Sequence, residues 1–213
     1  MSYTVKEIFL TLQGEGGQAG RVAVFCRFTG CNLWSGREQD RESAQCRFCD
    51  TDFVGTNGVN GGRFETAAEL ARKIDSFWPA TSRDRGRKLV VFTGGEPLLQ
   101  LDAALIAAMH ALDFDIAVES NGTVPAPAGI DWLCISPKAG APLLQTQGTE
   151  LKLVYPQPGL NPADLAHLDF RLFWLQPMDG VHQAENVKAA IEYCLEYPHW
   201  GLSLQTHKLT GIP

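Results

Sequence analysis

The stretch Leu89-Val-Val-Phe-Thr-Gly-Gly-Glu-Pro97 is the part of the sequence that most constrains the fold. Its first five residues are apolar or β-branched, as in a strand that is buried on both faces of a sheet. Two glycines follow, and Pro97 stands where a helix can begin, because proline is favoured at the first helical position. A buried strand that turns directly into a helix is typical of the β-α units of a parallel sheet.

The same alternation continues on both sides of this stretch. Patterns with apolar residues on one helical face run through Thr66 to Trp78, Leu101 to Leu112 and Val187 to Leu195. Further strand-like runs are Val22 to Phe28, Asp115 to Glu119, Trp132 to Ser136, Glu150 to Tyr155, Arg171 to Leu175 and Gly201 to Gln205.

The number of these units, set against the length of the chain, predicts the architecture. A complete eight-unit barrel needs roughly 250 residues, and this chain has 213. We therefore predict an α/β fold, a partial and open-sided parallel β/α barrel of about six or seven strands, as a single domain over residues 1–213. Loops are expected at Gly55 to Gly62 and at Thr81 to Lys88. Functional residues are expected where the strands end.

The composition excludes several classes of protein. The chain is 45% hydrophobic and 20% charged, so it can form a compact core. Its net charge is −6 and its basic residues form no long run, which disfavours binding to nucleic acid. The longest apolar stretch, Ala103 to Met109, has seven residues, whereas a membrane-spanning helix needs roughly 20. Because the first residues also lack the pattern of a secretory signal, we expect a cytoplasmic protein.

The six cysteines fall into two groups. In a reducing compartment, cysteines are metal ligands or core residues more often than disulfides. Cys26, Cys134 and Cys194 lie in apolar segments and are expected in the core. The others stand among polar residues at the spacing C-x14-C-x2-C and are Cys31, Cys46 and Cys49. Three thiolates leave one metal position open, as on an iron–sulfur cluster that binds a further ligand; a zinc site with a distant fourth ligand is the alternative.

Together these features carry a resemblance to a known family. The three cysteines, the aromatic Phe48 before the last of them and the Gly-Gly-Glu-Pro turn resemble the radical S-adenosylmethionine (SAM) superfamily. In that superfamily three cysteines hold a [4Fe-4S] cluster whose fourth iron binds SAM, and reductive cleavage of SAM gives a 5′-deoxyadenosyl radical. The usual spacing there is C-x3-C-x2-C, so the interval from Asn32 to Gln45 is a departure from the pattern.

Within the superfamily, the chain is similar over nearly its whole length to the 7-carboxy-7-deazaguanine synthases, some of which have a widened first interval. The segments that carry this similarity are Thr11-Leu-Gln-Gly-Glu-Gly16, Phe28-Thr-Gly-Cys-Asn-Leu-Trp34, Cys49-Asp-Thr51, Glu119-Ser-Asn-Gly122, Ser136-Pro-Lys138 and Gln205-Thr-His-Lys208. The resemblance implies a lyase of queuosine and 7-deazapurine biosynthesis, which converts 6-carboxy-5,6,7,8-tetrahydropterin to 7-carboxy-7-deazaguanine with loss of ammonia. It also implies Mg²⁺ as a further cofactor, a homodimer, and a flavodoxin- or ferredoxin-like electron donor.

The matching positions imply the site residues. The cluster ligands would be Cys31, Cys46 and Cys49, and Thr51 would contact Mg²⁺. The residues that match SAM-binding positions are Phe48, Cys49, Asp50, Gly95, Glu96, Ser120, Ser136, Pro137, Lys138, Leu175, Gln176 and Pro177. Those that match substrate-binding positions are Leu12, Gln13, Gly14, Glu15, Arg27, Thr93, His207 and Pro213.

Two of these roles also have a direct physical argument. A carboxylate accepts two parallel N–H donors from the edge of a pterin, which makes Glu15 the candidate to bind that edge. Alternation along its strand puts Arg27 on the face of Ala23 and Phe25, opposite Val24, and a buried arginine must meet an anion. That anion is either the substrate carboxylate or a protein carboxylate in a structural ion pair.

Two other functions stay open on the sequence. A glycyl-radical-enzyme activating protein is also short and also uses a three-cysteine cluster, but it acts on a protein backbone. The second alternative is a zinc-binding interaction module without catalytic activity. The Gln-Gly-Glu-Gly and Gln-Thr-His-Lys segments favour a pterin-sized ligand, and a zinc module has no use for the Gly-Gly-Glu-Pro turn.

The division of the cysteines gives a testable prediction. Cys31→Ala is expected to abolish SAM cleavage, because the cluster loses one of its three protein ligands. Cys194→Ala is expected to remove only packing and to leave cleavage intact. The measurement is the formation of 5′-deoxyadenosine by the reconstituted protein. Equal loss of cleavage in two folded variants would contradict the division.

Overall fold

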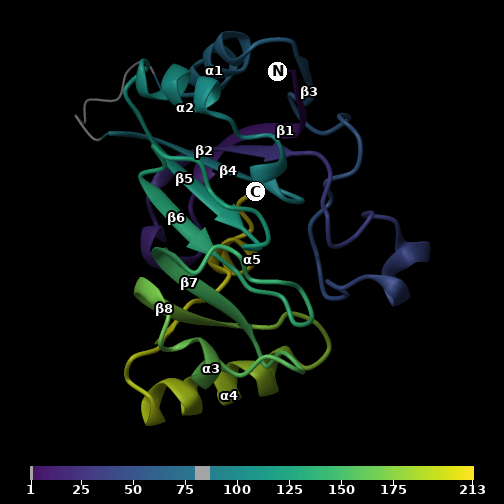
Figure 1. Ribbon diagram of the computed structural model, residues 1–213, viewed down its shortest axis with the longest axis vertical. Coiled ribbons are helices and arrows are strands. Elements are labelled where there is room, and N and C mark those ends of the chain that lie inside the picture. Colours follow the sequence, from purple (N-terminus) through teal and green to yellow (C-terminus); the bar gives the residue numbers. More distant parts are fainter. Residues whose placement is uncertain (1, 80–86) are drawn as a thin grey trace.

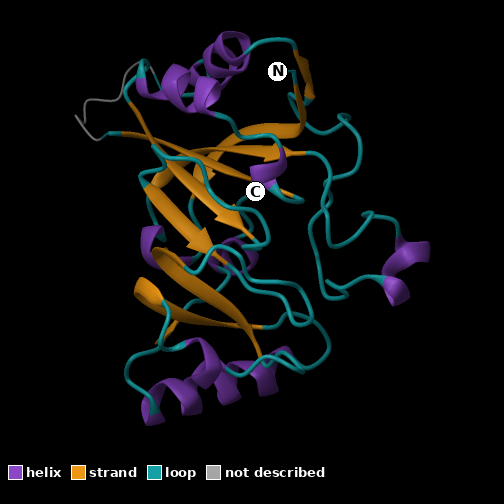
Figure 2. Cartoon of the chain, viewed as in Figure 1, coloured by secondary structure: helices purple, strands orange, loops and turns teal. Residues whose placement is uncertain are grey.

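The computed structural model describes residues 2–79 and 87–213, and a nine-stranded sheet forms its centre. The strand order is β3-β1-β2-β4-β5-β6-β7-β8-β9, so the sheet has two free edges and does not close into a barrel. Helices α1 and α2 lie at one end of the curved sheet, and α3 and α4 lie at the other (Figure 1). Figure 2 shows long loops along the side between these two helical layers.

The parallel part of the sheet matches the seven strands that the sequence predicts. Each strand from β2 onward, β3 excepted, pairs in parallel with the next. Their bounds are β2 (Val22–Phe28), β4 (Lys88–Gly94), β5 (Phe114–Ser120), β6 (Trp132–Ile135), β7 (Gln147–Tyr155), β8 (Asp169–Pro177) and β9 (Gly201–Leu202). The predicted α/β class and partial parallel barrel are therefore confirmed.

Two antiparallel strands at one edge were not predicted. β1 (Tyr3–Leu12) pairs with β2, and β3 (Gly62–Phe64) pairs with β1. The register of β1 shifts between Val5 and Glu7, so consecutive residues Val5 and Lys6 are both buried and the alternation that marks a strand is lost. β3 begins at the last residue of the predicted loop Gly55 to Gly62. Most of the second predicted loop, Thr81 to Lys88, lies outside the described residues.

The three predicted helices are α1 (Ala67–Asp75), α2 (Ala103–His110) and α4 (Gln183–Glu196). α1 begins where the side chain of Thr66 accepts the N–H of Glu69, and Asp102 caps α2 in the same way. Pro97 opens only one 3-10 turn, η3 (Pro97–Leu99). Shorter elements are η1 (Gly16–Gln18), η2 (Glu38–Ser43), α3 (Pro162–Leu165) and α5 (Thr206–Thr210). Across the described residues, every helix is too short or too polar to cross a membrane.

The outer face of the sheet is apolar, whereas the inner face also carries buried charged residues such as Glu150 and Lys152. On the outer face Val24, Cys26 and Phe28 belong to the main core together with α1 and α2, and Phe28 stacks on Phe92 with ring centroids 5.6 Å apart. The inner face is closed at one end by a smaller cluster around Ala23 and Val91. The connections 121–131 and 136–146 contain no helix, and the barrel is open between the edge strands β3 and β9. The main cavity of the protein lies at the carboxyl ends of the parallel strands.

The Gly-Gly turn after β4 fits against the backbone at the end of β2. A Cβ atom on Gly94, whose φ is 138°, would lie 2.2 Å from the carbonyl oxygen of Phe28. On Gly95 it would lie 2.0 Å from the carbonyl oxygen of Gly30 and 2.7 Å from the Cβ of Cys31. Any side chain at these positions would therefore displace the backbone that carries Cys31.

Gly95→Ala is expected to lower the free energy of unfolding by about 3 kcal/mol, because the new methyl group clashes with rigid backbone. Gly62→Ala is the matched control, since the nearest atom to its Cβ would be 3.9 Å away. That variant is expected to stay within about 1 kcal/mol of the parent protein. Urea denaturation measures both; a similar midpoint for the two variants would show that the close approach does not constrain the fold.

Candidate active site

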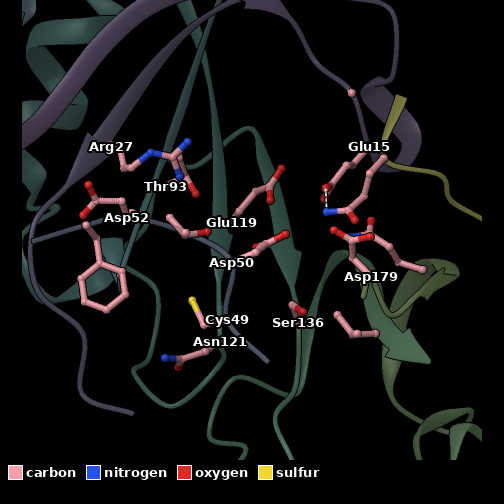
Figure 3. A pocket seen from close by; sticks show the side chains of 18 of the residues that line it. Glu15, Arg27, Cys49, Asp50, Asp52, Thr93, Glu119, Asn121, Ser136 and Asp179 are labelled. Carbon is pink, nitrogen blue, oxygen red and sulfur yellow. Dashed lines mark hydrogen bonds between the residues drawn. The ribbon is translucent and has the colours of Figure 1, made fainter. Parts of the chain in front are cut away.

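The carboxyl ends of the parallel strands surround a cavity of about 430 Å³. A cavity of this volume is the size of small-molecule sites in proteins. Figure 3 shows Arg27 and Asp52 on one side of it, Glu15 and Asp179 on the other, and Glu119 between them. Every residue predicted for the site lines this cavity except Glu96, Pro137 and Leu175. The tertiary structure thus brings together residues that the sequence separates by up to about 200 positions.

The three predicted cluster ligands lie in the wall of the cavity. Cys31 follows β2, and Cys46 and Cys49 end the long interval. The neighbouring Cys46 side chain and the backbone N–H of Thr51 lower the pKa of Cys49 to about 6. The same contact between the two side chains raises the pKa of Cys46, and burial raises that of Cys31. Cys49 is therefore held near the thiolate state that binds metals.

Three thiolates with no fourth protein ligand are a donor set that suits an iron–sulfur cluster with one open position. Over residues 2–79 and 87–213, no three His, Cys, Asp or Glu side chains gather as ligands of one ion. Cys31, Cys46 and Cys49 would hold a [4Fe-4S] cluster and leave one iron without a protein ligand.

Glu96 is buried behind the cavity wall, where it joins the ends of β4 and β5. Its carboxylate accepts hydrogen bonds from the N–H of Leu98 at 2.9 Å, the N–H of Asn121 at 2.8 Å and the hydroxyl of Ser120 at 2.9 Å. Burial raises the pKa of this carboxyl. Glu96 thereby positions Ser120 and Asn121, which do line the cavity. Its predicted contact with SAM stays a prediction.

Lys138 organises the neighbouring part of the wall. Its Nζ donates to the carbonyl and hydroxyl oxygens of Ser136 at 2.6 and 2.7 Å and lies 6.0 Å from the ring centroid of Phe48. Burial lowers the pKa of this ammonium group. Pro137 and Leu175 stand behind lining neighbours, whereas Gln176 and Pro177 face the cavity themselves.

An ion-pair network forms the floor of the cavity. The Nζ of Lys152, whose side chain is 4% exposed, lies 2.5 Å from Glu15 Oε2 and 3.0 Å from Glu119 Oε2. Gln13 donates to Glu119 Oε1 at 2.9 Å, and Gln205 donates to Glu15 Oε1 at 3.1 Å. The network therefore joins the loop after β1 to β5, β7 and the segment that follows β9.

The network holds Glu15 in its charged form. Burial by itself would raise the pKa of Glu15, but the ammonium of Lys152 and the hydrogen bonds from Lys152 and Gln205 lower it. Burial likewise opposes the charge of Lys152, yet Glu119 and Glu15 raise its pKa well above the usual value. One ammonium faces two carboxylates, so the floor keeps a surplus of hydrogen-bond acceptors for a ligand with N–H donors.

Arg27 meets a protein anion in this structure. Its Nε donates to Glu7 Oε1 at 2.8 Å, because the bulge in β1 places Glu7 opposite it. This is the structural ion pair that the sequence left open as the alternative. Arg27 still lines the cavity, beside Thr93 of the adjacent strand, so its contact with a substrate carboxylate stays a prediction.

The segment after β9 covers the cavity as a short helix, and the strand predicted over Gly201 to Gln205 ends early. His207 packs on Gly14, where a Cβ would lie 2.7 Å from its Nδ1. The Nζ of Lys208 lies 2.5 Å from Asp50 Oδ2 and 2.6 Å from Asp179 Oδ2. The hydroxyl of Thr11 donates to the carbonyl oxygen of Pro213 at 3.1 Å. These contacts place both His207 and Pro213 at the cavity.

Comparisons with known proteins identify the family of the chain. The family model of the radical SAM superfamily matches residues 41–206, which begins within the long interval between Cys31 and Cys46. The chain is 63% identical to the 7-carboxy-7-deazaguanine synthase of Caulobacter vibrioides and 60% identical to that of Bordetella pertussis, in each case over the full length of both chains. The crystal structure of QueE from Escherichia coli superposes with a TM-score of 0.70 at 25% identity, covering 96% of this chain and 94% of that one.

The chain belongs to the 7-carboxy-7-deazaguanine synthase family of radical SAM enzymes. Membership confirms the resemblance drawn from the sequence and implies the [4Fe-4S] cluster and SAM as cofactors. Of the functions that the sequence left open, the comparisons support this one over the activating protein and the zinc module. All three cysteines of this radical SAM enzyme line one cavity, as described above.

Several residues of the site were missed by the sequence analysis, chiefly Lys152, Glu119, Glu7 and Asp52. One signal for Lys152 was present, because Glu150 and Lys152 alternate with leucines in β7. Charges at every second position of an otherwise apolar strand indicate that one face lines a polar interior. Cys134 also differs from expectation: it is buried, but it lies beside Glu150 and Lys152 rather than in the apolar core.

Lys152→Met is expected to lower the free energy of unfolding by about 3–5 kcal/mol at neutral pH, because Glu15 loses its buried counter-ion. In the parent protein the lowered pKa of Glu15 stabilises the fold above the ordinary value of 4.5, and this contribution is lost as the pH falls below it. In the variant, burial raises the pKa of Glu15 instead. Protonation of Glu15 then removes its uncompensated buried charge. The difference in the free energy of unfolding between the parent protein and the variant therefore shrinks from pH 7 to about pH 5.

Lys88→Met is the matched control for this experiment. Lys88 pairs with Asp75 at 2.7 Å, but the two side chains are 30% and 36% exposed. Loss of such a pair is expected to cost about 0–1 kcal/mol. Urea denaturation at the two pH values measures all three proteins. Equal effects of the two substitutions, or a deficit of Lys152→Met that does not change with pH, would contradict the assignment.

Proposed function

We propose that the protein is a carbon–nitrogen lyase that converts 6-carboxy-5,6,7,8-tetrahydropterin to 7-carboxy-7-deazaguanine with loss of ammonia, as a step of queuosine and 7-deazapurine biosynthesis. The observation that carries the proposal is the content of one cavity. Three cysteines lie in its wall, an acceptor-rich floor contains Glu15, and the guanidinium of Arg27 lies at another side. The relatives named 7-carboxy-7-deazaguanine synthase support the same assignment.

Recognition of the pterin edge falls to Glu15. The 2-amino group and the neighbouring ring N–H of a pterin present two donors side by side, which one carboxylate accepts. Each oxygen of Glu15 already accepts one protein donor, from Lys152 or Gln205, and retains a further lone pair. Leu12, Gln13 and Gly14 lie next to it in the cavity lining and contact the rest of this edge.

The carboxylate of the substrate requires positive charge or N–H donors. Arg27 uses its Nε for Glu7, which leaves the two terminal amino groups of the guanidinium available for an anion. Thr93 pairs with Arg27 across the two strands, and His207 reaches the cavity from α5. Arg27 and Thr93 bind the end of the substrate opposite to Glu15, whereas His207 packs on Gly14 beside Glu15.

SAM and Mg²⁺ complete the proposed site. When bound, the cluster and SAM supply the one-electron chemistry that removes a hydrogen atom from the substrate. The proposed space for SAM is surrounded by Phe48, Asp50, Gly95 and the strand-end residues Ser120, Ser136, Lys138, Gln176 and Pro177. The hydroxyl of Thr51 is the proposed protein ligand of Mg²⁺, which commonly keeps several water and substrate oxygens.

The proposal extends to the setting of the enzyme. A small flavodoxin- or ferredoxin-like protein would deliver the electron, and the enzyme would act as a homodimer in the cytoplasm. The electron donor and the homodimer are implied by the family resemblance. The cytoplasmic location is the expectation from the sequence.

Anaerobic reconstitution with iron and sulfide tests the function directly. A brown protein with about four irons is expected, and with reductant, SAM, Mg²⁺ and 6-carboxytetrahydropterin it should yield 5′-deoxyadenosine and 7-carboxy-7-deazaguanine. Formation of 5′-deoxyadenosine without the deazaguanine would refute the substrate assignment and leave superfamily membership intact. Omission of Mg²⁺ from the same assay is expected to slow product formation, and an unchanged rate would remove Mg²⁺ from the proposal.

Glu15→Gln is expected to weaken substrate binding by about 1.5–3 kcal/mol, the free energy of a charge-assisted hydrogen bond. Glu185→Gln, on the exposed surface of α4, is the control for the loss of one negative charge. Isothermal titration calorimetry under anaerobic conditions gives both dissociation constants. An unchanged constant for Glu15→Gln would remove this residue from the substrate site.

A further inference from the structure

The long interval between the first two cysteines folds into a defined substructure. Residues 32–45 leave the end of β2, form the 3-10 helix η2 and return to Cys46 (Figure 1, blue helix at the right). Their polar side chains make local contacts: Ser35 donates to Asp40 at 2.6 Å, and the carboxylate of Glu38 accepts twice from Arg41 at 2.8 Å. These local contacts order the segment together with bonds at its two ends, from Asn32 to Thr123 and from Gln45 to the carbonyl oxygen of Gly140.

The turn from Cys46 to Asp50 is weakly held by main-chain bonding. It carries two of the three cysteines together with Phe48. In the part of the chain that the structure describes, residues 46–52 form only a loose turn at 47–48 and make no main-chain hydrogen bond of regular geometry. Since exposed irregular backbone opens at low free-energy cost, the geometry of this turn must come from side chains.

The far end of the turn is held by the ion pair of Asp50 with Lys208, and the part that carries the cysteines is held by Arg41. Its Nη1 donates to the carbonyl oxygen of Arg47 at 2.7 Å and to that of Cys49 at 3.0 Å, so the two bonds lie on either side of Phe48. Among the described residues, no other group donates with regular geometry to a main-chain carbonyl between positions 46 and 52. Hydrogen bonds from a guanidinium are charge-assisted and fix the geometry of the acceptors.

The side chain of Arg41 is itself held in place from two directions. The guanidinium lies over the ring of Trp34, 4.2 Å from the centroid, and Glu38 accepts from its Nε. Trp34 is 8% exposed and meets the buried Phe53 edge-on, with centroids 5.6 Å apart. The contacts therefore run from the buried wall of the cavity through Trp34 and Arg41 to the cysteine turn.

We propose that Arg41 is a positioning residue for the cluster, and that residues 32–45 serve to hold the Cys46–Cys49 turn from outside. The inference rests on the three-cysteine cluster of the proposed function. Arg41 touches neither SAM nor substrate in this scheme; it sets the backbone from which Cys46 and Cys49 bind iron. Loss of Arg41 loosens two of the three protein ligands and leaves Cys31, which the Gly-Gly turn fixes, in place.

The test is the rate at which the reconstituted cluster loses iron to a chelator under anaerobic conditions, followed by the visible absorbance. Arg41→Ala is expected to lose iron about tenfold faster than the parent protein, because two charge-assisted hydrogen bonds are removed. Arg41→Lys keeps the charge but not the planar fork, and an intermediate rate is expected. Arg37→Ala, in the same segment with an exposed side chain, makes the same change of charge and should behave as the parent.

Denaturation of the apoproteins gives the second measurement. The free energy of unfolding of Arg41→Ala should stay within about 1 kcal/mol of the parent, since the segment lies outside the core, while iron loss accelerates. Equal iron-loss rates in Arg41→Ala and the parent would overturn the inference, and so would equal acceleration in Arg37→Ala. If Arg41→Lys lost iron at the same rate as the parent protein, positive charge alone would be sufficient. That result would overturn the role proposed for the planar guanidinium. If the parent protein itself binds no four-iron cluster, the proposed function fails, which is a different result from a stable cluster in every variant.

Discussion

The close approach of Gly94 and Gly95 to the backbone of residues 28–30 is the constraint on which the rest of the site depends. It leaves no room for a Cβ atom, so the end of β4 lies directly against the end of β2. The carbonyl oxygens of Phe28 and Gly30 accept the N–H groups of Gly95 and Glu96 there. This contact fixes Cys31 on one side and Glu96 on the other. Through Glu96 it also fixes the end of β5, so one backbone contact sets three strand ends.

A second constraint is electrostatic. An ammonium group as deeply buried as that of Lys152 is stable only because Glu15 and Glu119 lie next to it. The same arrangement keeps Glu15 ionised against the effect of burial. The residue proposed to bind the pterin edge therefore owes its charge to a strand that is distant in sequence. Stability and ligand recognition depend on one network here, as is common where ionisable groups are perturbed in active sites.

The widened interval between Cys31 and Cys46 forms a third part of the site. Residues 32–45 form a small substructure whose Trp34 packs on the wall of the cavity and whose Arg41 reaches the turn of Cys46 and Cys49. An insertion that departs from the usual superfamily spacing is thus compatible with the same cluster, because the added residues support the turn from outside. The spacing along the chain differs, while the ligands meet at the same cavity.

The sequence by itself determined the parallel strands and the three main helices, because buried β-α units leave strong local patterns, and the family resemblance of its motifs implied many of the residues that line the cavity. It missed β1, where a bulge breaks the alternation, and β3, which has only three residues. Only the tertiary structure decided how charges pair: that Arg27 meets Glu7, that Lys152 meets Glu15 and Glu119, and that Arg41 holds the cysteine turn. Pairing depends on distance in space between residues far apart in sequence, and a local pattern carries no information about that distance.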